Sequence, residues 1–269
     1  MNYTFYCAKN RGLITFSENS SFAAFNTGLV DDFYKDIFGF FEKTHNCKKS
    51  WNFLGFSVWE SGMGKRLSRD FLKQPDRVTY FEKLDDIFFD TDKKVTVDMP
   101  HILLDNLDRL PLEFIEKEFR AELSTDKMAE IESLFHDIRT GQHGEKCKAL
   151  STLREYIECN KAIRKRLESQ FTHALNIAIT RCKWNYKTAI PIFYHISNKL
   201  SLLLPIHLSG DEKAPDVSLV VEKVNEANYQ GQTILTMEMA YKDARLICRP
   251  ESYWLRTEAL AEPGKAKLL

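Results

Sequence analysis

Residues 190–238 read IPIFYHISNKLSLLLPIHLSGDEKAPDVSLVVEKVNEANYQGQTILTME, and they hold the densest apolar and β-branched runs in the chain. Short runs of this kind, bounded by turn-forming residues, are typical of β-strands. The pattern predicts strands at residues 190–194, 200–208, 217–222 and 233–238. The polar run Asn225-Glu226-Ala227-Asn228 predicts a hairpin between the last two. The stretch therefore predicts the central antiparallel sheet of the protein.

Beyond this stretch the sequence changes character, because after Met239 the apolar period becomes helical or turn-like. Tyr241, Arg245 and Arg249 then cluster shortly before Trp254. The guanidinium group of arginine presents donors in a fork that suits phosphate. Residues 240–254 are therefore predicted to form the wall of a polar site at the end of the sheet.

The middle of the chain carries helical patterns at residues 124–138 and 146–183, with an interruption near Asn160. Ser124 is placed to cap the first of them. The outer face of the second is basic, with Arg154, Lys161, Arg164, Lys165, Arg166, Arg181 and Lys183. Such a face can contact nucleic acid or simply be solvated, and the sequence leaves both interpretations open.

The N-terminal part mixes turn signals with aromatic residues. Residues 12–16 and 21–25 predict a hairpin, and Asp31-Asp32 is placed to cap a helix over residues 33–43. A strand is predicted within residues 51–59, then a flexible basic turn over residues 61–66. A second hairpin is predicted from residues 86–90 and 95–98.

These elements predict an α+β fold in which an antiparallel sheet, formed mainly by C-terminal strands, packs against central helices. A single domain is expected over residues 1–269. It would comprise the N-terminal hairpin and helix at residues 12–43, the helical middle at 124–183 and the sheet at 190–254.

Composition limits the functional classes. The chain has 269 residues and no formal net charge, so no overall field favours nucleic acid or an acidic membrane. Its six cysteines are scattered without a Cys-x-x-Cys pair, which disfavours a zinc site and a disulfide framework. No apolar run approaches the roughly 20 residues that span a bilayer. We therefore expect a cytoplasmic protein with reduced thiols and no membrane partner.

Metal and covalent chemistry are also disfavoured. The seven histidines show no metal-binding spacing, and no serine or cysteine lies in a nucleophile motif. The order of Asp76, Asp92 and Lys94 resembles the motif of magnesium nucleases that use paired carboxylates. Asp92 and Lys94 fall in a predicted turn, however, which lacks the rigid positioning that a strand would give them. We therefore expect no metal and no cofactor.

A metal-free polar site is the remaining catalytic hypothesis. A histidine can serve as general acid or base in phosphodiester cleavage while arginines stabilise the developing charge. His101 would be that residue, within a segment bounded by Pro100 and Pro111. The phosphate would bind Arg109, Arg245 and Arg249, and Asn26 and Tyr241 would orient the substrate. The alternative is that His101 is a structural residue and that the arginines pair with carboxylates such as Asp243 or Glu251.

Several motifs, taken in order, resemble one known family. They are FNTGL at residues 25–29, HILLDNLDRLP at 101–111, NKLSLLLPI at 198–206, PDVSLVVEKV at 215–224 and YQGQTILTMEMAYKDARLICRPESYWL at 229–255. Together they resemble the bacterial family catalogued as domain of unknown function 3825, over about residues 12 to 256. The resemblance brings no reaction with it.

What the resemblance does imply is work on or near RNA, because members of that family are often fused to LOTUS-type (OST-HTH) RNA-binding domains. We expect this chain to depart from that pattern, with no such domain appended, which weakens the expectation that it selects RNA on its own. The recurrent polar positions of the family correspond here to Asn26, His101, Asn106, Arg109, Asn198, Asp216, Tyr241, Arg245 and Arg249.

The functional expectation is accordingly an RNA- or nucleotide-handling protein. In its catalytic form it is a metal-independent RNA phosphodiesterase, with His101 catalytic and with Asn26, Asn106, Arg109, Asn198, Tyr241, Arg245 and Arg249 binding the substrate. Two alternatives remain open: a non-catalytic module that binds RNA or a small nucleotide, and a scaffold that binds only protein. The sequence leaves open whether the protein is an enzyme.

Overall fold

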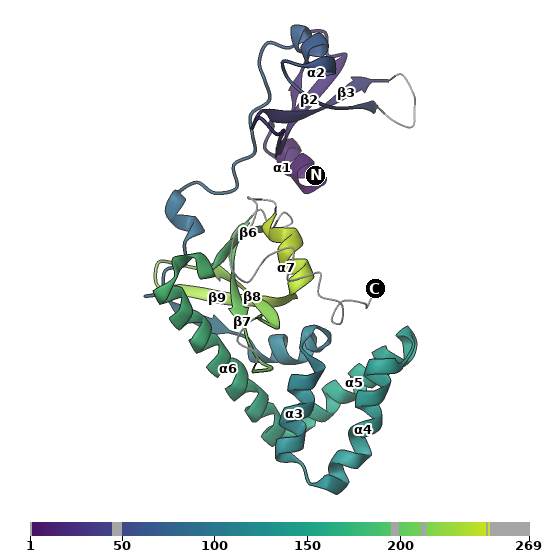
Figure 1. Cartoon of the computed structure of the whole chain (residues 1–269), viewed down its shortest axis with the longest axis vertical. Coiled ribbons are helices and arrows are strands. Elements are labelled where there is room, and N and C mark those ends of the chain that lie inside the picture. The colour runs from purple at the N-terminus through teal and green to yellow at the C-terminus, as the bar shows by residue number, and fades with distance from the viewer. Residues whose placement is uncertain (1, 45–49, 195–198, 211–213, 246, 248–269) are drawn as a thin grey trace. The chain divides into compact units, whose positions relative to one another are not determined.

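A computed structural model describes residues 2–44, 50–194, 199–210, 214–245 and 247 (Figure 1). These residues divide into two compact units. The N-terminal unit comprises the described residues of Met1–Glu82 and Tyr194–Lys199, and the C-terminal unit those of Lys83–Phe193 and Leu200–Leu269. Each unit has a sheet of its own, so the single expected domain contains two cores.

The N-terminal unit is built on a four-stranded antiparallel sheet of order β1-β2-β3-β4. Its strands are β1 Thr15–Phe16, β2 Phe22–Val30, β3 Asp36–Lys43 and β4 Trp51–Val58. The unit also contains helices α1 Asn2–Asn10 and α2 Gly62–Leu67 and the short 3-10 helix η1 Ser68–Asp70. The predicted hairpin is confirmed, since Thr15 and Phe16 pair with Ala24 and Ala23, and so is the strand at 51–59.

Two local predictions for this unit are wrong. The helix expected over residues 33–43 is largely strand β3, in which Phe38 and Phe40 point to the same face and are buried with Leu67 and Phe71. Aromatic residues favour strands, and pairing on both sides of β3 overrides the helical spacing. The basic turn expected at residues 61–66 is mostly helix α2.

The C-terminal unit contains a mixed five-stranded sheet of order β5-β9-β8-β7-β6. The strands are β5 Lys94–Val97, β6 Ile190–Tyr194, β7 Lys199–Ile206, β8 Val217–Lys223 and β9 Asn228–Thr236. The predicted hairpin between β8 and β9 is confirmed. The hairpin expected from residues 86–90 and 95–98 is wrong, because Leu84–Ile87 forms the 3-10 helix η2 and β5 pairs in parallel with β9.

The helices of this unit confirm the predicted helical middle. They are α3 Leu112–Glu122, α4 Thr125–Thr140, α5 His143–Cys159 and α6 Lys161–Trp184, followed by the 3-10 turn η5 Tyr186–Thr188 and, after the sheet, α7 Met237–Ala244. The interruption near Asn160 separates α5 from α6. The side chain of Asn160 accepts hydrogen bonds from the amides of Ala162 and Ile163, which caps α6.

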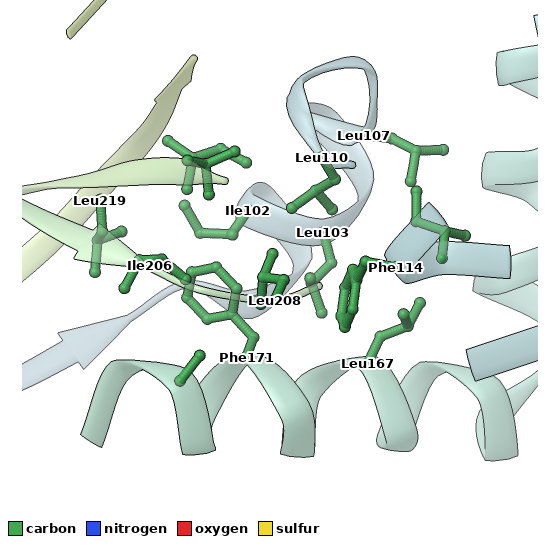
Figure 2. Close-up of a cluster of buried hydrophobic side chains, with 14 of the residues drawn as sticks. Ile102, Leu103, Leu107, Leu110, Phe114, Leu167, Phe171, Ile206, Leu208 and Leu219 are labelled. Carbon is green, nitrogen blue, oxygen red and sulfur yellow. The ribbon is translucent and has the colours of Figure 1, made fainter. Parts of the chain in front are cut away.

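The sheet of the C-terminal unit has an apolar cluster on each face, because successive residues of a strand point to opposite sides. Leu204 and Leu219 lie in the main core with Phe171 of α6. Figure 2 shows Phe171 beside Ile206 and Leu208. Leu203, Val220 and Leu235 instead pack with Ala240 and Ala244 of α7. The sheet therefore lies between α6 on one face and α7 on the other (Figure 1).

Candidate functional site

The site begins with a short helical segment that connects β5 to α3. His101–Asp105 forms a π-helical turn (η3), and Leu107–Arg109 follows as a 3-10 turn (η4). Ile102, Leu103 and Leu104 are buried in the main core, so the polar residues between and after them are held in fixed positions. Single π-helical turns are rare and occur often at functional sites.

Asp105 contacts two basic side chains, His101 in this segment and Arg154 in α5. One of its carboxylate oxygens lies 3.0 Å from Nδ1 of His101, and the other accepts a hydrogen bond of 2.6 Å from Arg154 of α5. All three side chains are exposed by about 43 to 47%. The hydrogen bond with His101, and then the charge of Arg154, hold the pKa of Asp105 below its usual value.

Asn106 and Arg109 connect this pair to the sheet. Asn106 is buried. Its side-chain amide nitrogen donates to the backbone carbonyl of His101 at 2.8 Å and lies 3.3 Å from Nε2 of the His101 ring. Its amide oxygen accepts a 3.2 Å hydrogen bond from the hydroxyl of Thr233 in β9. Arg109 donates to the same hydroxyl at 3.0 Å and to the carbonyl of Ile234 at 2.8 Å.

The position of Arg109 has a structural explanation. β5 pairs with β9 only as far as Gly231, so no strand of the described residues lies beside the next part of β9 on that side. The guanidinium group of Arg109 supplies a donor to the carbonyl of Ile234 beyond that point. Buried backbone groups require such partners. Arg109 thus closes the edge of the sheet, with η4 packed beside it.

Tyr241 and Arg245 lie on the other face of the sheet. The Tyr241 ring packs against the cluster that contains Leu203 and Leu235, and the guanidinium of Arg245 lies 5.7 Å from the centre of that ring. The His101 segment packs on the face that carries Leu204 and Ile234. Within the described residues, the structure therefore does not bring Arg245 together with His101.

The other predicted site residues are placed as follows. Asn26 belongs to the N-terminal unit, where it is buried, donates to Asp36 at 2.9 Å and accepts from the amide of Gly28, at the bulge between β2 and β3. Asp216 accepts hydrogen bonds from the amides of Leu208 and Ser209 and so fixes the turn after β7. Asn198 and Arg249 lie outside the described residues.

All four arginines of the predicted basic helix face have partners. Arg154 pairs with Asp105, Arg164 with Glu168 at 2.9 Å, and Arg166 with Glu118 at 3.0 Å, while Arg181 lies 2.5 Å from Nε2 of His207. In the first three pairs a carboxylate neutralises the positive charge of the arginine, so the helix face is less basic than its sequence alone indicates.

Three residues of this network are absent from the predicted site, namely Asp105, Arg154 and Thr233. Asp105 has a sequence signal, since it follows His101 by four residues and so faces it on a helical turn. Arg154 has none, because nothing in the sequence indicates that α5 packs against residues 101–109. Thr233 was expected only as part of a strand.

Two further observations limit the site. The described residues contain no group of three His, Cys, Asp or Glu side chains that could hold a metal ion. Among them, no helix has both the length and the apolarity that crossing a membrane requires.

A shallow groove of about 560 Å³ lies away from the His101 segment, along the outer face of α6, where it is lined by residues that include His173, Arg181 and Trp184.

The Asp105 contacts predict a pH-dependent contribution to stability. The pKa of Asp105 is lower in the folded protein than in the unfolded chain. Its charge therefore stabilises the fold above the unfolded-chain pKa of about 3.9, and this contribution is lost as the pH falls through the folded pKa. The melting temperature of wild type should exceed that of Asp105→Asn at pH 7, and the difference should shrink towards pH 3.

Thermal unfolding between pH 7 and pH 3 measures this difference. Asp108→Asn is the matched control, because Asp108 is an exposed carboxylate of the same segment and has no hydrogen bond or ion pair within the described part of the chain. A gap between wild type and Asp105→Asn that stays constant down to pH 3 would contradict the ion-paired role of Asp105.

Comparison with known proteins assigns the chain to a family. Neither the curated proteins nor the solved structures contain a match to this chain. A family model does match, over residues 1–254, and therefore covers both units, including the His101 segment and α7. The chain belongs to the family described as domain of unknown function (DUF3825).

Proposed function

We propose that the protein binds RNA or a nucleotide in the cytoplasm without cleaving it. The resemblance to a family whose members are often fused to LOTUS-type RNA-binding domains supports the RNA part. The four cysteines of the described residues that are free thiols, Cys7, Cys147, Cys159 and Cys182, support a reducing compartment. In the proposed site, His101 and Arg154 flank Asp105 at the surface and contact the ligand.

One observation favours binding over cleavage: His101 and Arg245 pack on opposite faces of the sheet. Cleavage needs a proton-transfer group and a preorganised cation at the same phosphate. Near His101, Arg109 donates to the edge of β9 and Arg154 to Asp105. Binding is less demanding, because an exposed imidazole and a guanidinium group that is already oriented suffice to contact a phosphate.

The phosphodiesterase remains the second candidate, and the geometry of His101 favours it. A carboxylate at Nδ1 orients an imidazole so that Nε2 can accept a proton, as in catalytic triads. Asp105 holds that position at 3.0 Å. Nε2 lies 3.3 Å from the amide nitrogen of Asn106, however, so that contact would have to break before a substrate hydroxyl could approach.

Incubation with end-labelled RNA, with and without a chelator, distinguishes the candidates. We expect wild-type protein to retain RNA at low salt and to leave it intact, and we expect His101→Ala to lower retention several-fold because a direct contact is lost. Asp108→Asn, which changes the charge of the same segment away from His101, should retain RNA as wild type does.

Other outcomes would overturn the proposal. Cleavage that survives chelation and is lost in both His101→Ala and Asp105→Asn would support the phosphodiesterase. Neither retention nor cleavage, by a protein whose circular dichroism spectrum is that of a folded chain, would leave the protein scaffold as the remaining hypothesis.

A further inference from the structure

The N-terminal sheet presents a row of aromatic side chains on one face. Across β3 and β4, Phe41 pairs with Phe53 and Lys43 with Trp51, so these four side chains lie on the same side. The rings of Phe53 and Phe56 are 4.7 Å apart. We call Phe16, Trp51, Phe53 and Phe56 the aromatic face; Phe16 and Trp51 complete it, with ring centres 5.7 Å apart.

The aromatic face is exposed, unlike the opposite side of the same sheet. There, Phe38 and Phe40 are buried in a cluster with Leu67 of α2. On the aromatic face, Phe16 is 51% exposed, Phe53 50% and Phe56 45%. Adjoining exposed aromatic side chains of this kind mark an interaction surface more often than isolated ones do.

Other aromatic side chains pack beneath the aromatic face. Phe5 of α1 contacts Phe25 and Phe41, which places α1 over the part of the sheet next to β4. Phe41 in turn contacts Phe53. Gly39 leaves room for this packing, because a Cβ at that position would collide with the ring of Phe25. Phe53 of the aromatic face therefore rests on a layer of packed aromatic side chains.

Exposed lysines lie on β3 and on α1, the elements next to the aromatic face. Lys43 is exposed and pairs with Trp51 on this side of the sheet. Lys9 lies one helical turn after Phe5 in α1 and is exposed as well. By strand alternation, the described strand residues on this side include no carboxylate, since Glu42 points to the opposite face.

We propose that the aromatic face binds single-stranded RNA by stacking unpaired bases on Phe53, Phe56 and Trp51, with Lys43 and Lys9 next to the phosphates. This inference rests on the proposed RNA-handling function and adds to the His101 site a second surface, in the N-terminal unit, with a substrate class. Aromatic rings on an open sheet, together with cations, are how proteins bind single strands without reading sequence. Cations beside the rings favour a polyanion over an apolar protein partner.

The test is fluorescence anisotropy with a labelled 12-nucleotide oligouridine, using the full chain. Phe53→Ala with Phe56→Ala should weaken binding at least about tenfold, because each stacked base contributes substantially to affinity. The control is Phe33→Ala with Tyr34→Ala. It removes two rings that are 83% and 87% exposed at the turn between β2 and β3, outside the aromatic face. It should leave affinity unchanged.

A second variant tests the same surface in case Phe53→Ala/Phe56→Ala fails to fold. Lys43→Glu alters charge on an exposed side chain without removing a ring, and it should also weaken binding, increasingly so at low salt. Affinities of Phe53→Ala/Phe56→Ala and Lys43→Glu equal to that of wild type would overturn the inference while leaving RNA binding itself intact.

Two other results would also overturn it. No binding by wild type would remove both the inference and the proposed function. A change from a wild-type oligomer to a monomer when the rings are removed, measured by size-exclusion chromatography with light scattering and without an effect on RNA affinity, would assign the aromatic face to contact between copies of this chain.

Discussion

Phe171→Ala should lower the free energy of unfolding of the C-terminal unit by about 3 to 5 kcal/mol, as expected for a fully buried phenylalanine in a packed core. Phe171 is 0% exposed and lies in the cluster that joins α6 to the sheet and to residues 101–110. Alanine favours the helix, so the loss would come from the cavity and not from helix propensity. A small domain has only about 5 to 15 kcal/mol of stability, so this is a severe change.

Ile177→Ala provides the matched control. Ile177 lies in the same helix but is 38% exposed, so its replacement should change stability by no more than about 0.5 kcal/mol. Urea unfolding measures both variants, and hydrogen exchange by mass spectrometry shows whether the loss of protection in Phe171→Ala is confined to the C-terminal unit. Equal stability of the two variants would contradict the central position of α6 in this core.

The Phe171 core also determines the geometry of the candidate site. Ile102, Leu103 and Leu104 pack into the same cluster, which leaves His101 and Asp105 at the surface. A cavity at Phe171 should therefore loosen the His101–Asp105 contact even though Phe171 touches neither residue's polar group. For this reason, functional assays of core variants need a folding control.

The sequence predicts strongly patterned elements well. Residues 190–238 show strand composition with polar breaks, and four strands lie there, while the apolar stripe of residues 146–183 corresponds to α5 and α6. The prediction was wrong over residues 33–43, because Phe33, Ile37, Phe40 and Phe41 have helical spacing, whereas in β3 Phe40 and Phe41 point to opposite faces that are both covered. Pairing with β2 and β4, which decides between helix and strand, is not a local property of the sequence.

The candidate site could be predicted only in part. The spacing of His101 and Asp105 is local and was visible in the sequence. Whether Arg245 shares a face with His101 depends on the alternation of side chains along β9, since Ile234 and Leu235 point to opposite clusters. A shift of one residue in register reverses those faces, so clustering in sequence does not establish clustering in space. The pairing of Arg154 with Asp105 depends likewise on helix packing.

Gly64→Ala should destabilise the N-terminal unit by about 1 to 3 kcal/mol, although alanine normally stabilises a helix relative to glycine by about 1 kcal/mol. A Cβ on Gly64 would collide with the backbone carbonyl of Val58 at the end of β4. The amide of Gly64 also donates to the hydroxyl of Ser57 at 3.1 Å, which holds α2 close to the strand. The added methyl group would force α2 away and break that hydrogen bond.

Gly144→Ala is the control with the opposite sign. Gly144 lies in α5, is exposed and has open space around its Cβ position, so alanine should raise stability by up to about 1 kcal/mol. Thermal unfolding measures both variants, and hydrogen exchange assigns each effect to its unit. If both substitutions stabilised the protein, α2 would not approach β4 as closely as this. The aromatic face on the other side of the same strand would then lose a fixed support, because α2 packs directly behind β4.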